Sequence, residues 1–165
     1  MRAKFIYESI DDVLKPKSKE DIIKDLSKFS KEEIINGNFI LKTVENNSKD
    51  LVKKLLFKGC FPNKLYNGKN LLKVASQYNY KDIVEMLIYF GADVNEKDVD
   101  GMSPLQAACA HFSDKNIIEI LLKHGADPNY KNKHGYTALG YAKVVFSTPI
   151  REEVIELLKK YGAIE

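Results

Sequence analysis

Residues 98–129 read DVDGMSPLQAACAHFSDKNIIEILLKHGADPN, and this stretch decides the fold. Asp100-Gly101 favours a turn, because glycine tolerates a positive φ. Ser103-Pro104 suits the start of a helix, since serine accepts a backbone N–H and proline lacks the N–H that the first helical position does not use. Apolar residues at helical spacing between 117 and 122 predict a second helix, which Gly125 ends. The stretch therefore predicts a turn, two short helices and a second turn.

The same unit recurs along the chain. The terminator GADPN at 125–129 follows GADVN at 91–95 by 34 residues, and Gly91 follows Gly59 by 32 residues. Gly162-Ala163 comes 37 residues after Gly125. The openings at 67–75 and 134–142 fall where the turn and helix of the first stretch predict them. Terminators and openings in phase indicate a repeat protein.

This unit resembles the ankyrin repeat. Ser103-Pro104-Leu105 stands where the family has Thr-Pro-Leu, Gln106 stands where it has His, and Ala107-Ala108 follows. The resemblance implies a β-turn and an antiparallel helix pair about every ~33 residues. We therefore expect an all-α ankyrin-repeat solenoid of about four helix-turn-helix repeats with an N-terminal capping helix.

The repeat frame also divides the chain. We expect a flexible N-terminal arm at 1–17 and one ankyrin-repeat domain at 18–165. Within that domain we expect the capping helix and a degenerate first repeat at 18–63, the second repeat at 64–95, the third at 96–129 and a C-terminal capping repeat at 130–165. The first repeat has Asn38-Phe39-Ile40 in place of the usual opening, and Pro149 should break the last repeat.

Composition narrows the class of protein. The chain has 165 residues, 44% of them hydrophobic, and a formal charge of +3. The sequence contains no run of 18 apolar residues of the kind that predicts a membrane span. The two cysteines, Cys60 and Cys109, fall at different positions of different repeats, which favours reduced, packed thiols. We expect a soluble, cytoplasmic monomer. Its richness in Lys, Asn and Ile is typical of AT-rich genomes and suggests a bacterial or viral adaptor or effector, in the second case acting in a host cell.

No motif for catalysis stands out. His111, His124 and His134 lack a carboxylate or thiol partner at metal-ligand spacing, and no glycine-rich phosphate loop or nucleophile motif is present. We therefore expect no enzyme activity, no cofactor and no metal site.

The resemblance implies that a partner protein binds the concave face, which the turn tips and the inner helices form. Tyrosine and methionine are enriched in interface cores, and the exposed positions of this face carry both. The predicted partner-binding residues are Tyr66, Asn67, Lys69, Gln77, Tyr78, Val99, Asp100, Met102, His111, Lys133, His134 and Tyr136. We expect Tyr66 to point from the tip itself and to form a ladder with Met102 and Tyr136. The other interpretation is that each tyrosine lies flat on its own repeat.

A second function class stays open. The N-terminal third is rich in lysine between Lys15 and Lys31, which is a feature of nucleic-acid or anionic-lipid binding. Aspartate and glutamate interleave with these lysines, which favours a solvated mixed face. The chain has only two arginines, Arg2 and Arg151, so few side chains can form bidentate hydrogen bonds with phosphate groups. Specific nucleic-acid recognition is therefore disfavoured.

Overall fold

In a computed structural model of the protein, the described residues are 30, 32, 34, 38–111, 113–145 and 149–164. They hold eight α-helices and no β-strand beyond an isolated bridge between Tyr66 and Lys69, which confirms the expected all-α class. The chain forms two compact units, residues 1–61 and 62–165. The expected arm at 1–17 and the helix expected from Ser18 lie outside the described residues. No helix in the described part of the chain is long and apolar enough to cross a membrane.

The first unit contains the helix pair of the degenerate first repeat. Helix α4 (Phe39–Glu45) packs on α5 (Lys49–Phe57), and their apolar residues are buried except for Phe57, which is 69% exposed. The N-cap of α4, Asn38, makes no side-chain hydrogen bond to the first turn of its helix. The thiol of Cys60 lies 3.8 Å from the Ile34 carbonyl oxygen and is buried.

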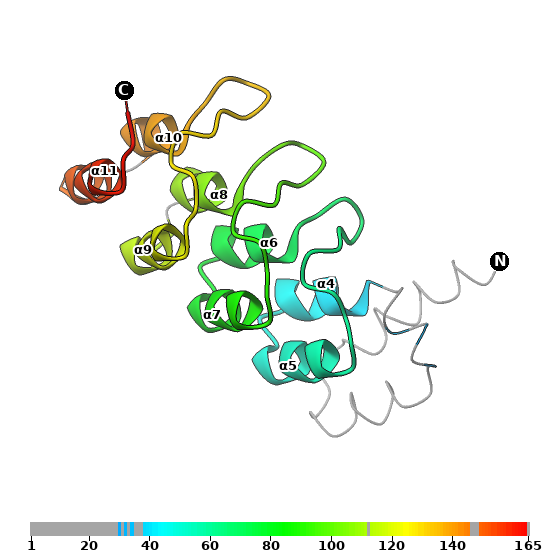
Figure 1. Ribbon diagram of the computed structural model, residues 1–165. Helices are drawn as coiled ribbons and strands as arrows, with labels where there is room; N and C mark the ends of the chain where they lie inside the picture. Colours follow the sequence, from blue (N-terminus) through cyan, green and yellow to red (C-terminus); the bar gives the residue numbers. More distant parts are fainter. Residues whose placement is uncertain are drawn as a thin grey trace. The chain divides into compact units, whose positions relative to one another are not determined.

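The second unit stacks three helix pairs. These are α6 (Leu71–Gln77) with α7 (Lys81–Tyr89), α8 (Pro104–Ala110) with α9 (Lys115–Lys123), and α10 (Ala138–Val145) with α11 (Ile150–Lys160). Helix α8 contacts both α6 and α10, and α9 contacts both α7 and α11. Figure 1 shows α6, α8 and α10 as an inner row and α7, α9 and α11 as an outer row. The loops that precede the inner helices project beyond that row.

Local sequence signals explain where these helices begin and end. Ser103 and Gln106 form a reciprocal capping box at α8, and Pro104 is the first residue of that helix, as predicted. Ala107, Ala108 and Cys109 are fully buried, and their small size lets the neighbouring inner helices come close. Pro149 caps α11, which agrees with the predicted break; residues 146–148 lie outside the described residues.

A ladder of asparagines links successive terminator turns within the second unit. The Asn63 side chain donates to the Gly91 carbonyl at 2.9 Å and accepts the Asp93 N–H at 2.7 Å. Asn95 makes the same two bonds to Gly125 and Asp127, and Asn129 makes them to Gly162 and Ile164. Each asparagine thus ties its own turn to the terminator that follows the next helix pair, which explains its fixed place four residues after each terminator glycine.

Candidate functional site

The turn tips of the third and fourth repeats share one design. The Asp98 carboxylate accepts the backbone N–H groups of Asp100 and Met102 at 3.0 and 3.1 Å. Asn132 accepts those of His134 and Tyr136 at the same two distances. Both acceptor side chains are buried beneath their turns. Side-chain acceptors of this kind hold the backbone in a turn. Met102 and Tyr136 occupy equivalent positions, because each donates its N–H to the acceptor four residues before it.

The tip of the second repeat is one residue shorter. Tyr66 and Lys69 exchange two backbone hydrogen bonds of 3.0 Å, and Asn67 and Gly68 between them have φ values of 51° and 74°. Positive φ at both central residues defines a type I′ turn, for which Asn-Gly is the favoured pair.

This short turn overturns the prediction for Tyr66. Tyr66 follows Asn63 by three residues, as Asp98 follows Asn95, so it takes the position beneath the tip and is only 1% exposed. The prediction that Tyr66 points from the tip is therefore wrong. Lys69, which directly follows the turn glycine, is the true equivalent of Met102 and Tyr136.

Successive tips lie directly on one another. The Val99 N–H donates to the Gly68 carbonyl at 3.1 Å, and a Cβ atom at Gly68 would meet the Val99 methyl groups at 3.0 Å. The Lys133 ammonium donates to the Val99 carbonyl at 2.6 Å, and its methylene groups cover Gly101. The three tips thus form a continuous ridge, here called the tip ridge, made by residues 66–69, 98–102 and 132–136.

Two of the three predicted tyrosines, Tyr78 and Tyr136, keep about half of their surface in solvent. Tyr78 is 50% exposed and stacks on Tyr80 at 5.8 Å between ring centroids, while Tyr136 is 51% exposed and leans on Tyr141 at 5.3 Å. The other predicted residues are exposed or partly exposed: Asn67, Lys69, Gln77, Val99, Asp100, Met102, His111, Lys133 and His134. All except Tyr66 are therefore accessible.

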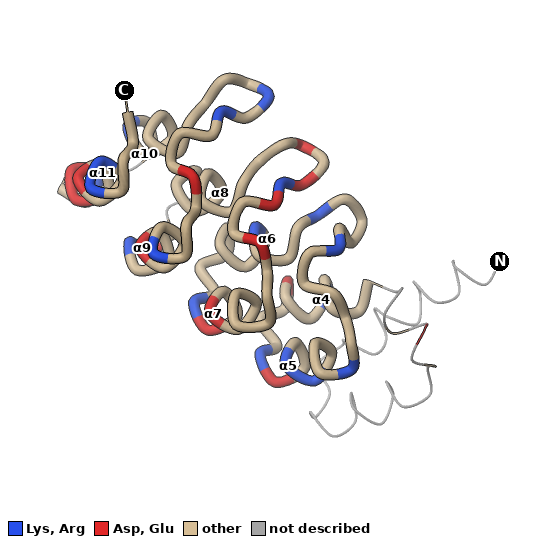
Figure 2. Tube along the Cα trace, viewed as in Figure 1, with Lys and Arg blue, Asp and Glu red and all other residues tan. Residues whose placement is uncertain are grey.

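Charge alternates along the tip ridge. In Figure 2 the loop before α6 carries basic residues, the loop before α8 carries mainly acidic residues together with Lys97, and the loop before α10 is basic again. Asp98 is neutralised by Lys73 of α6, whose ammonium lies 3.1 Å from its carboxylate. Burial, and secondly the charge of Lys73, lower the pKa of His111 below its ordinary value, so its ring is neutral at neutral pH.

The described residues bring together no group of three His, Cys, Asp or Glu side chains able to hold a metal ion. Burial raises the pKa of the Cys109 thiol to about 12, so that thiol stays protonated and is a poor nucleophile. The lysines that carry the alternative function, Lys15 to Lys31, lie outside the described residues.

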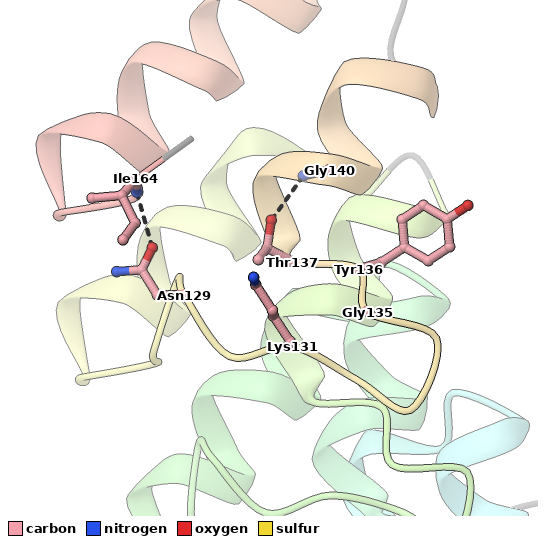
Figure 3. Close-up of a pocket in the computed structure, with 7 residues that line it drawn as sticks. All are labelled: Asn129, Lys131, Gly135, Tyr136, Thr137, Gly140 and Ile164. Carbon is pink, nitrogen blue, oxygen red and sulfur yellow. Dashed lines mark hydrogen bonds between the residues drawn. The ribbon is translucent and has the colours of Figure 1, made fainter.

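Sequence reasoning missed a cavity on the fourth repeat, which Figure 3 shows. Its volume is about 260 Å³, and it is lined by Asn129, Lys131, Gly135, Tyr136, Thr137, Gly140 and Ile164. One signal could have found it: Gly140 stands within α10 where the second and third repeats have Lys73 and Gln106.

The family model for ankyrin repeats (3 copies) matches residues 17–98, 40–132 and 90–164. The Arabidopsis thaliana protein named "Potassium channel GORK" is similar to part of the chain, with 38% identity over 74 residues. The matched region is 44% of this chain and only 9% of that protein.

Proposed function

The chain belongs to the ankyrin-repeat family, whose members are in general protein-protein interaction modules, and from this premise we propose that it binds a partner protein through its concave face. That face consists of the tip ridge and the exposed positions of α6 and α8. The proposed role is that of a non-catalytic adaptor or effector, acting as a monomer in a reducing cytoplasm. Two buried cysteines without a disulfide support that compartment.

The observation that carries the proposal is the tip ridge itself. Backbone hydrogen bonds and glycine contacts hold its turns rigidly, so little conformational entropy is lost when a partner docks. Met102, which is partly exposed within the tip ridge, and Tyr78, which is 50% exposed at the C-terminal end of α6, are the candidate anchors. The alternation of charge favours a partner whose surface is acidic, basic and acidic in the same order, because complementary potentials steer association.

A site-specific photocrosslinker tests the location of this surface. Benzoylphenylalanine at Asp100 or His134 should form a covalent adduct with a partner in a lysate of cells that express the protein. The same group at Glu85 or Glu156, which are exposed on the outer helices, serves as the matched control. Adducts that form from the outer helices and not from the tips would place the binding surface elsewhere.

The captured partner then allows an affinity test. Replacing Tyr78 and Met102 together by Ala should lower the melting temperature little, since surface substitutions cost about 0.5 kcal/mol or less. The affinity should fall by at least about fivefold per side chain if each contributes about 1 kcal/mol. Tyr89→Ala is the control, because Tyr89 is an exposed tyrosine on the outer helix α7. A double variant that loses stability and binds as before would discard this choice of anchors.

A further inference from the structure

The third repeat holds a tyrosine that belongs to the next repeat. The Tyr130 hydroxyl donates to the Gly101 carbonyl oxygen at 3.0 Å, and the Lys97 ammonium lies 4.7 Å from the centroid of the Tyr130 ring. The Gln106 side chain donates to the Tyr130 backbone carbonyl at 2.9 Å. A hydrogen bond, a cation-π contact and a backbone contact therefore define a tyrosine seat on the third repeat.

The fourth repeat carries the same frame 34 residues later, because Asn129 follows Asn95 by that distance. The residues equivalent to Lys97, Gly101 and Gln106 are Lys131, Gly135 and Gly140, and all three line the cavity of about 260 Å³. The cavity is thus the counterpart of the seat that holds Tyr130.

Gly140 removes from this cavity the side chain that Gln106 supplies at the equivalent position of the third repeat. Glycine is less favourable than alanine within a helix, so its presence in α10 indicates a local requirement. A Cβ atom there would meet the Thr137 hydroxyl oxygen and the Tyr136 ring at 3.6 Å, which is an ordinary contact. The backbone therefore does not require glycine at this position, and the missing side chain leaves space open. Since an apolar cavity of ~150 Å³ accepts benzene, about 260 Å³ is enough for a phenol ring.

We propose that this cavity binds a tyrosine side chain presented by a loop of a partner protein. The ring lies against the Lys131 ammonium and the hydroxyl donates to the Gly135 carbonyl, as Tyr130 does with Lys97 and Gly101. Figure 3 shows the Lys131 side chain extending between Ile164 and Thr137, so its ammonium lines the cavity and can contact a ring bound beside it. Ile164, an exposed apolar residue, supplies contact area at the rim.

The first test is an NMR titration of the ¹⁵N-labelled protein with the peptide acetyl-Gly-Tyr-Gly-amide. We expect a dissociation constant on the order of millimolar, as for a small ligand with few contacts. Amide shifts should be confined to the cavity residues, among them Lys131, Gly135 and Gly140. The matching Gly-Phe-Gly peptide lacks the hydroxyl donor and should bind about threefold to tenfold more weakly. Absence of localised shifts, or equal binding of both peptides, overturns the proposal.

Two variants locate the peptide. Gly140→Leu keeps a good helix former in α10 and fills the cavity, so it should abolish binding, whereas Ala110→Leu on α8 should not. Lys131→Gln removes the cation and should weaken binding severalfold, whereas Lys81→Gln at the start of α7 should not. Unchanged binding by either cavity variant contradicts the proposal. Because the probe is a defined peptide, this test can fail while the concave-face proposal stands, and the reverse also holds.

Discussion

The ion pair between Lys73 and Asp98 should be the most sensitive polar contact between the second and third repeats. The two side chains are only 14% and 2% exposed, and their charged atoms lie 3.1 Å apart. The same carboxylate also accepts the N–H groups of Asp100 and Met102, so it holds both the neighbouring repeat and its own turn. Asp98→Ala removes all three contacts and leaves a largely buried ammonium without its partner.

The cost of Asp98→Ala should be about 3–5 kcal/mol, the range observed when one partner of a buried pair is removed. Asp98→Asn should cost less, about 2–3 kcal/mol, because an amide oxygen can still accept the turn N–H groups. The chain itself contains that arrangement, since Asn132 holds the fourth tip with an amide.

The double variant Lys73→Gln with Asp98→Asn should recover most of this loss and lie within about 1 kcal/mol of the natural protein, because it leaves no unpaired charge. Urea unfolding followed by circular dichroism at constant m-value measures each free energy. A cost below about 1 kcal/mol for Asp98→Ala would refute the reasoning. Strict additivity of the two single changes would refute it as well.

Three further outcomes are expected. Tyr130→Phe should lower the free energy of unfolding by about 0.5–1.5 kcal/mol in urea, because the Gly101 carbonyl loses its donor, while Tyr89→Phe should change nothing. Cys109, whose pKa is raised to about 12 by burial, should react with iodoacetamide at pH 8 only as fast as the protein unfolds, so rapid labelling of the folded protein would contradict its burial. The NMR titration midpoint of His111 should lie below 6.5, because burial and the charge of Lys73 lower its pKa, and Lys73→Gln should raise the midpoint only in part. Since a lowered folded pKa means that the unfolded chain binds the proton more tightly, the His111 contribution to stability is present above pH 6.5 and lost as the pH falls through the folded pKa.

The sequence by itself determined the repeat frame and the helices of the third repeat. The capping residues of α8, the left-handed glycine at 125 and the apolar spacing of α9 all lie within a few residues of the structure that they specify. Signals of this kind act through local hydrogen bonds and helix periodicity, so the helices of one repeat can be predicted from its own sequence. The recurrence of the same pattern in the neighbouring repeats confirms that prediction.

Only the tertiary structure decided which side chains of the tips reach solvent. Tyr66 is buried because its turn is one residue shorter, and the position beneath each tip is recognisable only by comparison with Asp98 and Asn132 in their folded turns. The pairing of Lys73 with Asp98 and the seat of Tyr130 each join residues from two repeats, at distances that no local pattern encodes. The cavity beside Gly140 also depends on tertiary packing. A helical glycine in the sequence marks a missing side chain, but whether the space stays open depends on how the surrounding repeat packs.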